Sequence, residues 1–149
     1  MLVRWLFAAL HLLALGIGLG AVWSRGRALQ GTLDTRGLTR VFYADTWWGI
    51  AAILWIATGL VRAFGGLGKG SAYYVNNSFF RIKMTLLIII LLVEIMPMVG
   101  LIRWRIAVRR GVQPDTRAAG RFASISFIEA GLVILMVLAA TAMARGYGS

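Results

Sequence analysis

Apolar residues fill four long stretches of the chain, and polar residues gather in the segments between them. The stretches run approximately over residues 5–23, 41–61, 79–102 and 122–144. Each can cross a hydrocarbon core of about 30 Å as a helix that rises about 1.5 Å per residue. Their apolar residues are continuous and do not alternate with polar ones, which favours helices over strands. The pattern predicts an all-α integral membrane protein, in which residues 1–149 form a single four-helix bundle domain.

The composition supports this prediction and removes several kinds of chemistry. Hydrophobic residues make up 60% of the chain and charged residues only 14%, which leaves more apolar surface than a soluble domain of 149 residues can bury. The absence of cysteine excludes disulfides, thiolate metal sites and cysteine nucleophiles. Because His11 is the single histidine, one subunit cannot provide a bis-histidine haem site.

Positive charge is concentrated in the first and third connections between the predicted helices. A net charge of +11 would suggest nucleic acid for a soluble protein, but these arginines lie where they would meet lipid headgroups, so we expect no nucleic-acid partner. The two connections hold ten basic residues: Arg25, Arg27, Arg36, Arg40, Arg103, Arg105, Arg109, Arg110, Arg117 and Arg121. Five belong to the opposite side: Arg4, Arg62, Lys69, Arg81 and Arg145. This excess predicts that both connections are cytoplasmic and both termini are outside.

Five ionisable residues lie within or at the edge of the apolar stretches: His11, Asp45, Lys83, Glu94 and Glu129. A charge inside a bilayer costs several kcal/mol, so such residues usually face the bundle interior and often mark function. Lys83 and Glu94 are about three turns apart and share nearly the same helix face. Glu94 and Glu129 are predicted at similar depth, so we expect at least one of them to hold a proton.

Two interpretations of these polar residues remain open. In one, Glu94, Glu129 and Lys83 are catalytic groups of a proton relay or polar substrate pocket. In the other, the carboxyl groups only lock the helices by hydrogen bonding, while Lys83 extends to the headgroups. His11 by itself is more often a hydrogen-bonded core residue than a metal ligand. Asp45 begins the predicted second helix, which favours a stabilising role at that helix N-terminus.

Several polar residues are spaced along the four predicted helices as they are in a known family of membrane proteins. The first predicted helix contains Trp5 and His11 and is followed by Arg27. Arg40 begins the second helix, and Lys83 lies early in the third. The fourth helix follows Arg121, contains Glu129 and is followed by Arg145. This pattern resembles the HemJ-type protoporphyrinogen IX oxidases and, more loosely, the membrane domain of CopD copper-resistance proteins. Still more closely, the chain looks like a member of a family of predicted bacterial inner-membrane proteins with no assigned function.

The HemJ-type resemblance implies a haem b site, with His11 as the metal ligand and Lys83, Arg27 and Arg40 near the porphyrin carboxylates. The sequence departs from that family where Glu94 replaces a second histidine and Gly131 replaces a proline after the fourth-helix glutamate. We therefore expect a multi-pass protein of the bacterial inner membrane that binds haem or porphyrin and is related to oxidoreductases. Whether it is an enzyme is left open.

Two further functions remain as alternatives. The chain could be a non-enzymatic membrane subunit that forms a homodimer or packs against a larger complex, since Gly16 and Gly20 offer a surface that another helix could approach closely. Packing of these glycines within the bundle is the competing interpretation. A small transporter is the least favoured function, because inverted repeats are not found. In every case the lipid bilayer is the expected surrounding.

Overall fold

The computed structural model describes residues 1–64 and 78–145, and this part of the chain is helical apart from short connections. Its helices are α1 (Leu2–Gln30), α2 (Thr35–Phe64), α4 (Ser78–Arg109) and α5 (Ala119–Ala144). All four are long and apolar enough to cross a membrane, which confirms the predicted all-α membrane fold. Two segments lie outside the described part: residues 65–77 and residues 146–149. The first includes Lys69, one of the basic residues from which the orientation was predicted.

The helices are longer than the apolar stretches predicted, and they include several arginines that we expected in connections. Arg25 and Arg27 lie in α1, Arg40 in α2 and Arg105 in α4. The start of α2 is set by Asp34, whose Oδ1 accepts the N–H of Gly37 at 2.8 Å as an N-terminal cap. An apolar stretch indicates only the part of a helix that lies in the hydrocarbon core. Arginine has a high helix propensity, so the helix can continue through the arginine-containing residues beyond that stretch.

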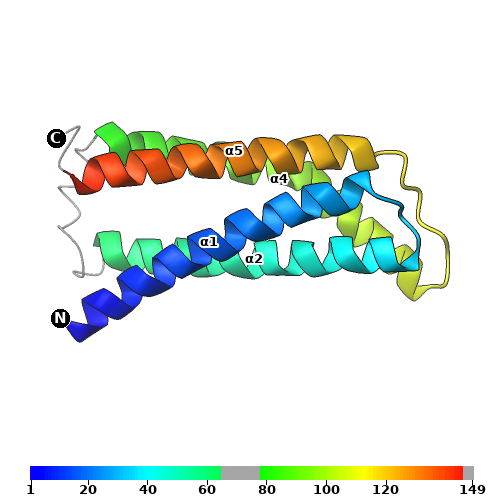
Figure 1. The fold of residues 1–149 in the computed structure, drawn as a ribbon, viewed down its shortest axis with the longest axis horizontal. Helices are drawn as coiled ribbons and strands as arrows, with labels where there is room; N and C mark the ends of the chain where they lie inside the picture. Colours follow the sequence, from blue (N-terminus) through cyan, green and yellow to red (C-terminus); the bar gives the residue numbers. More distant parts are fainter. Residues whose placement is uncertain (65–77, 146–149) are drawn as a thin grey trace.

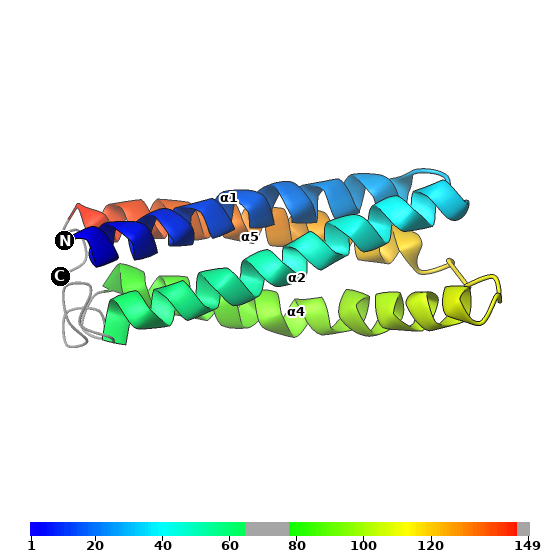
Figure 2. The ribbon, with the colours of Figure 1, turned by 90° about the horizontal axis from the view of Figure 1, so that it is seen from below.

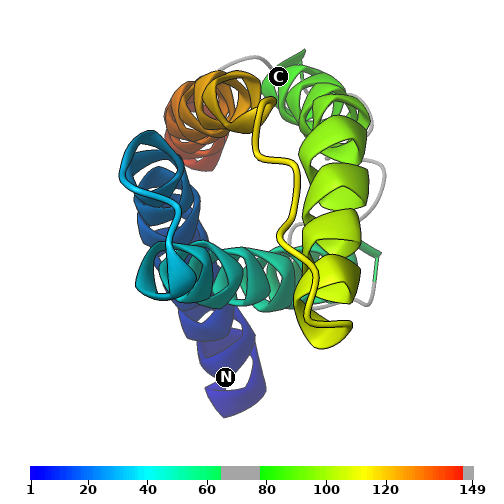
Figure 3. The ribbon, with the colours of Figure 1, turned by 90° about the vertical axis from the view of Figure 1, so that its right-hand side faces the viewer.

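The bundle is formed mainly by three helix pairs: α1 with α2, α1 with α5, and α4 with α5. The helices run along the length of the molecule in both side views (Figures 1 and 2) and surround a common axis in the end view (Figure 3). The first residues of α1 and the last residues of α5 lie at one end, and the α1–α2 and α4–α5 connections lie at the other (Figure 1). The side of the membrane that each end faces stays a prediction.

Two apolar clusters fill the interior, one toward each end. The cluster nearer the termini includes Ala14, Val22, Trp48, Trp55, Ile90, Val133 and Met136. The cluster nearer the arginine-rich connections includes Leu29, Leu38, Val41, Leu101, Trp104 and Phe122. Each of the four helices places one buried or half-buried charged residue between the residues that it gives to the two clusters: Arg25, Asp45, Glu94 and Glu129. A charged layer therefore separates two apolar layers.

Candidate functional site: a buried charge layer

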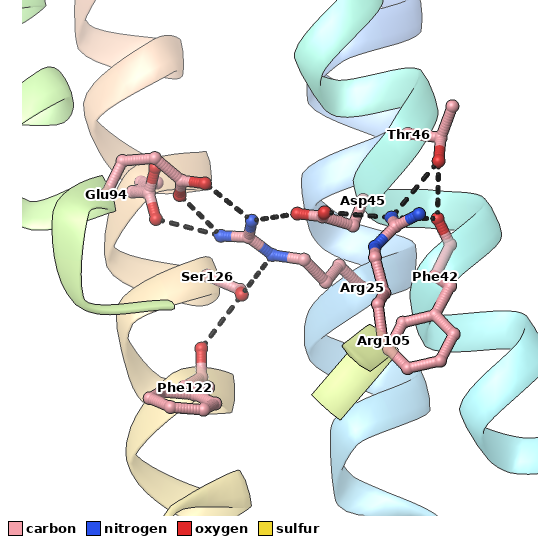
Figure 4. Close-up of polar contacts among 9 residues, drawn as sticks. Arg25, Phe42, Asp45, Thr46, Glu94, Arg105, Phe122 and Ser126 are labelled. Carbon is pink, nitrogen blue, oxygen red and sulfur yellow. Dashed lines mark hydrogen bonds and ion pairs between the residues drawn. The ribbon is translucent and has the colours of Figure 1, made fainter. Parts of the chain in front are cut away.

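Arg25 is the centre of the charge layer, and its side chain is completely buried. A guanidinium group carries five N–H donors, and all five are used. Nε donates to Ser126 Oγ at 2.9 Å. Nη1 donates to Asp45 Oδ1 and Glu94 Oε2, both at 2.9 Å. Nη2 donates to Glu94 Oε1 at 2.8 Å and Glu129 Oε1 at 3.0 Å. One side chain of α1 thus binds α2, α4 and α5 (Figure 4).

Arg105 adds a second positive charge at the edge of the layer (Figure 4). Its Nη2 atom lies 3.1 Å from Asp45 Oδ2 and also donates to the Phe42 carbonyl and the Thr46 hydroxyl. Asp45 therefore bridges Arg25 and Arg105, one guanidinium on each carboxylate oxygen. Since Asp45 lies ten residues into α2, the role at a helix N-terminus that we predicted for it is wrong.

Close helix packing holds these side chains together. A Cβ atom at Gly26, next to Arg25, would lie 2.9 Å from the ring of Phe127 on α5. On α4, a Cβ atom at Gly100 would collide with the ring of Phe122. These two glycines allow α5 to approach α1 on one side and α4 on the other. The short distances from Arg25 to the carboxylates of α4 and α5 depend on this approach.

Charge in the layer is incompletely balanced. Two guanidinium groups face the carboxyl groups of Asp45, Glu94 and Glu129. Glu129 is the least compensated of these carboxyl groups: its side chain is fully buried, and its Oε1 atom accepts a hydrogen bond from an Arg25 nitrogen that Glu94 shares. Its Oε2 atom is buried without a hydrogen-bond partner in the described part of the chain. With all three carboxyl groups ionised, the layer would carry a net charge of −1.

An apolar cavity of about 70 Å³ adjoins the charge layer on the side of the termini. All four helices line it, and the lining is apolar apart from Glu94. Trp55, another lining residue, has a buried Nε1–H without a partner among the described residues. The cavity therefore has one ionisable group on its wall.

His11 belongs to a separate polar group nearer the termini. Its ring stacks on Trp55 with centroids 4.8 Å apart, and its Nδ1 atom lies 2.9 Å from Thr58 Oγ1. The Lys83 ammonium lies 4.9 Å from the centre of the Trp55 ring. His11 and Lys83 thus lie at similar depth, with Trp55 contacting both. Trp55 also lines the cavity whose wall includes Glu94, so the cavity extends between the two polar groups.

Comparison with known proteins shows which family the chain belongs to. A family model described as "Predicted membrane protein (DUF2214)" matches residues 3–148. The chain belongs to this family. No curated protein and no solved structure matches it. Membership in a family of predicted membrane proteins is therefore shown, whereas the resemblance of this DUF2214 chain to HemJ-type oxidases and CopD domains stays a prediction.

The structure brings together only some of the site residues that we predicted for this DUF2214 protein. Glu94 and Glu129 meet at Arg25, so both face the interior and both contact another polar group. Lys83 lies apart from them, beside Trp55. Arg27 and Arg40 line a separate groove between α1 and α2, and Arg27 is about 24 Å along α1 from His11. A porphyrin bound at His11 would not reach them.

Arg25 and Arg105 are the members of the site that the sequence analysis missed in this family member. Arg25 lies on the face that α1 buries, whose residues recur mostly every three or four positions: His11, Ala14, Gly18, Ala21, Val22, Arg25, Gly26 and Leu29. That periodicity continues the interior face past the end of the apolar stretch. Arg105 carries no comparable signal, because its partner Asp45 is 60 residues away in the sequence.

Gly16 and Gly20 have a different position from the buried glycines. No atom lies within 4 Å of a Cβ atom built at either residue. Their face of α1 therefore points away from the bundle, and packing within the bundle is not their role.

Proposed function

We propose that the charge layer is a proton-exchange site, in which Glu94 and Glu129 share one proton and pass it to or from a molecule in the adjoining cavity. The observation that carries this proposal is the imbalance of three buried or half-buried carboxyl groups against two guanidinium groups. One proton makes the layer neutral. Neutrality matters here because an uncompensated charge is very costly at membrane depth.

The arrangement separates a storage group from an accessible group. Glu129 is fully buried, whereas the side chain of Glu94 is 16% exposed and lines the cavity. Both carboxyl groups contact the same Nη2 atom of Arg25, so a proton can move between them without a large displacement of either side chain. Glu94 is then the group that meets the substrate, and Glu129 is the group that holds the proton.

The substrate class follows from the surroundings of Glu94. The cavity is otherwise apolar, and α2 and α4 are the neighbouring helices with the least mutual contact. A hydrophobic ring compound with exchangeable hydrogens, dissolved in the bilayer, would enter between these helices. Proton transfer to or from such a ring is general acid–base chemistry, and a ring as large as a porphyrin would reach Glu94 only if α2 and α4 moved apart.

Infrared spectroscopy of the purified protein in lipid nanodiscs tests the shared proton. We expect a protonated carboxyl C=O band at neutral pH that shifts when the buffer is exchanged for D₂O and is lost in Glu129→Gln. Asp115→Asn is the matched control, because Asp115 lies in the exposed α4–α5 connection. A wild-type protein with no such band would overturn the proposal, and so would a band that never shifts in D₂O, because that carboxyl group would be structural only.

His11 supports a second candidate function, haem binding. The Thr58 hydroxyl donates to the Leu54 carbonyl at 2.7 Å, so its oxygen accepts the Nδ1–H of His11. The Nε2 lone pair of His11 is then available to a metal, in the tautomer that metal-ligating histidines commonly adopt. The cavity itself is too small for a macrocycle, since sites for drug-sized ligands are about 300–1,000 Å³. Haem would therefore have to part α2 from α4.

An absorption spectrum after addition of haem b tests this candidate. We expect a Soret band in the wild type that His11→Ala abolishes while the protein stays folded. Thr58→Val should keep the band but weaken haem affinity roughly 10- to 100-fold, because it removes the group that orients the imidazole. Identical spectra for the wild type and His11→Ala would show that His11 is not a ligand, and the hydrogen bond to Thr58 would then be its role.

A further inference from the structure

A surface groove between α1 and α2 lies at the end of the bundle that carries the arginine-rich connections. Its volume is about 640 Å³. Exposed aromatic side chains on its walls are Trp23, Tyr43 and Trp47, and its lining also includes Arg27 and Arg40. None of the residues of the charge layer lines it, so the groove is distinct from the proton-exchange site.

The groove changes from charged to apolar along its length. Arg27 and Arg40 lie nearest the α1–α2 connection, while Ile17 on α1 and Trp47 on α2 lie further from it along the two helices. Ten residues of α1 separate Arg27 from Ile17, which corresponds to about 15 Å along the helix axis. A phospholipid has the same polarity over a comparable length, with its phosphate at the interface and its acyl chains toward the membrane centre.

Both arginines are available to a ligand. Within the described chain neither Arg27 nor Arg40 makes an ion pair, although Arg25 and Arg105 nearby do. The groove lining also includes small residues, among them Gly20 and Ala44, which leave room for an acyl chain. Gly20 has no atom within 4 Å of a built Cβ. The groove thus combines two free guanidinium groups with an open apolar channel.

We propose that this groove binds one anionic phospholipid, whose phosphate lies between Arg27 and Arg40 and whose acyl chain follows the α1–α2 surface past Gly20 toward Ile17. Guanidinium groups bind phosphate oxygens in charge-assisted hydrogen bonds. The exposed tryptophans and tyrosine suit the headgroup level of the membrane. This end of the bundle is also the one that the arginine excess predicts to be cytoplasmic, and the cytoplasmic leaflet is rich in anionic lipid.

Native mass spectrometry of the full chain, released from nanodiscs of equal parts phosphatidylglycerol and phosphatidylcholine, tests the site. We expect the wild type to retain one phosphatidylglycerol in preference to phosphatidylcholine. The double substitution Arg27→Gln with Arg40→Gln should reduce that preference by roughly thirtyfold, since each basic residue near an anionic surface contributes about one kcal/mol. Arg36→Gln is the charge control, because Arg36 is exposed on α2 and lies outside the groove.

A steric variant keeps the test decisive if the charge variants fold poorly. Gly20→Leu should occupy the channel and displace the lipid, whereas Gly16→Leu, one turn away and outside the groove, should retain it. Equal retention of both lipids by the wild type would overturn the proposal, as would unchanged phosphatidylglycerol retention in both the arginine and the Gly20 variants. Copurification of a stoichiometric protein subunit that excludes lipid and is lost in Gly20→Leu would assign the groove to that subunit and refute lipid binding.

Discussion

At the scale of single residues, the clearest contrast is between two arginines of α1. Arg25 is fully buried and gives all five of its N–H groups to side chains of the other three helices. Arg27, two residues later, is exposed in the groove between α1 and α2. The residues have the same chemistry, and their position on the helix face alone decides that one stabilises the bundle and the other is free to bind a ligand.

Substitution of Arg25 should therefore be far more damaging than substitution of Arg27. Arg25→Gln leaves three carboxyl groups facing one guanidinium, and we expect it to lower the free energy of unfolding by about 3–5 kcal/mol, as for other broken buried ion pairs. Arg25→Lys should recover only part of this loss, because an ammonium group has three donors and cannot bind in a planar fork. Arg27→Gln should leave stability nearly unchanged. Unfolding of the detergent-solubilised protein, followed by circular dichroism, measures all three.

Two comparisons show whether the loss comes from the charge layer. In the Glu94→Gln background, Arg25→Gln should cost less than in the wild type, because the carboxylate that Arg25 binds through two hydrogen bonds is already absent; additive effects would contradict the coupling. Asp115→Asn removes a fully exposed pair, in which hydrogen bonds from the Arg117 side chain lower the pKa of Asp115 below its usual value. Solvent screens that pair, so stability should not change measurably.

At the scale of the helices, the bundle depends on close approaches at particular glycines. Gly100 on α4 faces the ring of Phe122 on α5. That ring cannot easily move away, because Phe122 is buried and packs against Trp104 with ring centroids 5.5 Å apart. Pro97 is buried within the same helix, one turn after Glu94, and removes a backbone donor there. The position of Glu94 thus depends on the course of α4 and on its distance from α5.

Alanine substitutions at two glycines should have opposite effects. Gly100→Ala forces α4 away from α5 and should destabilise the protein by about 1–3 kcal/mol through overpacking. Gly131→Ala, on α5, meets no atom within 4 Å and should stabilise it slightly, because alanine has the higher helix propensity. Thermal unfolding of the two variants side by side measures the difference. If both substitutions stabilise the protein, the close contact between Gly100 and Phe122 does not limit the helix spacing.

At the scale of the whole molecule, the structure changes the charge count that predicts orientation. Arg25 and Arg105 point into the charge layer, so they do not meet lipid headgroups as we expected. Eight basic residues remain at the end with the two connections, against the five counted for the other side. The excess persists after this correction, and the predicted orientation, with cytoplasmic connections and external termini, is unchanged.

Reporter fusions test the orientation directly. Reporters inserted at Arg36 and Arg110, or fused after Ser149, should show that the two connections are cytoplasmic and the C-terminus is external. Substituting four arginines at this end of the bundle that lie outside the charge layer, Arg36, Arg109, Arg110 and Arg117, by Gln should produce a mixed or inverted population, since the excess then disappears. A wild-type protein with a cytoplasmic C-terminus would contradict the prediction.

The sequence by itself determined the membrane fold and the identity of most ionisable residues in the interior. Continuous apolar stretches predict spanning helices because lipid cannot satisfy backbone polar groups, and that constraint is local to each stretch. For the same reason Glu94 and Glu129 could be assigned to the interior from their surroundings in the sequence. The helix ends were less well predicted, since arginines can either continue a helix or follow it.

Only the tertiary structure decided which polar residues meet. The partners of Arg25 lie 20, 69 and 104 residues away along the chain, so their contact depends on how four helices rotate and cross, which no local pattern specifies. The same packing placed Lys83 with Trp55 and His11 instead of with the carboxyl groups, and moved Asp45 from a helix end into the charge layer. Helix rotation follows from the sum of many small contacts, among them Gly26 with Phe127 and Gly100 with Phe122, and these contacts hold the helices at the spacing at which one guanidinium reaches three carboxyl groups.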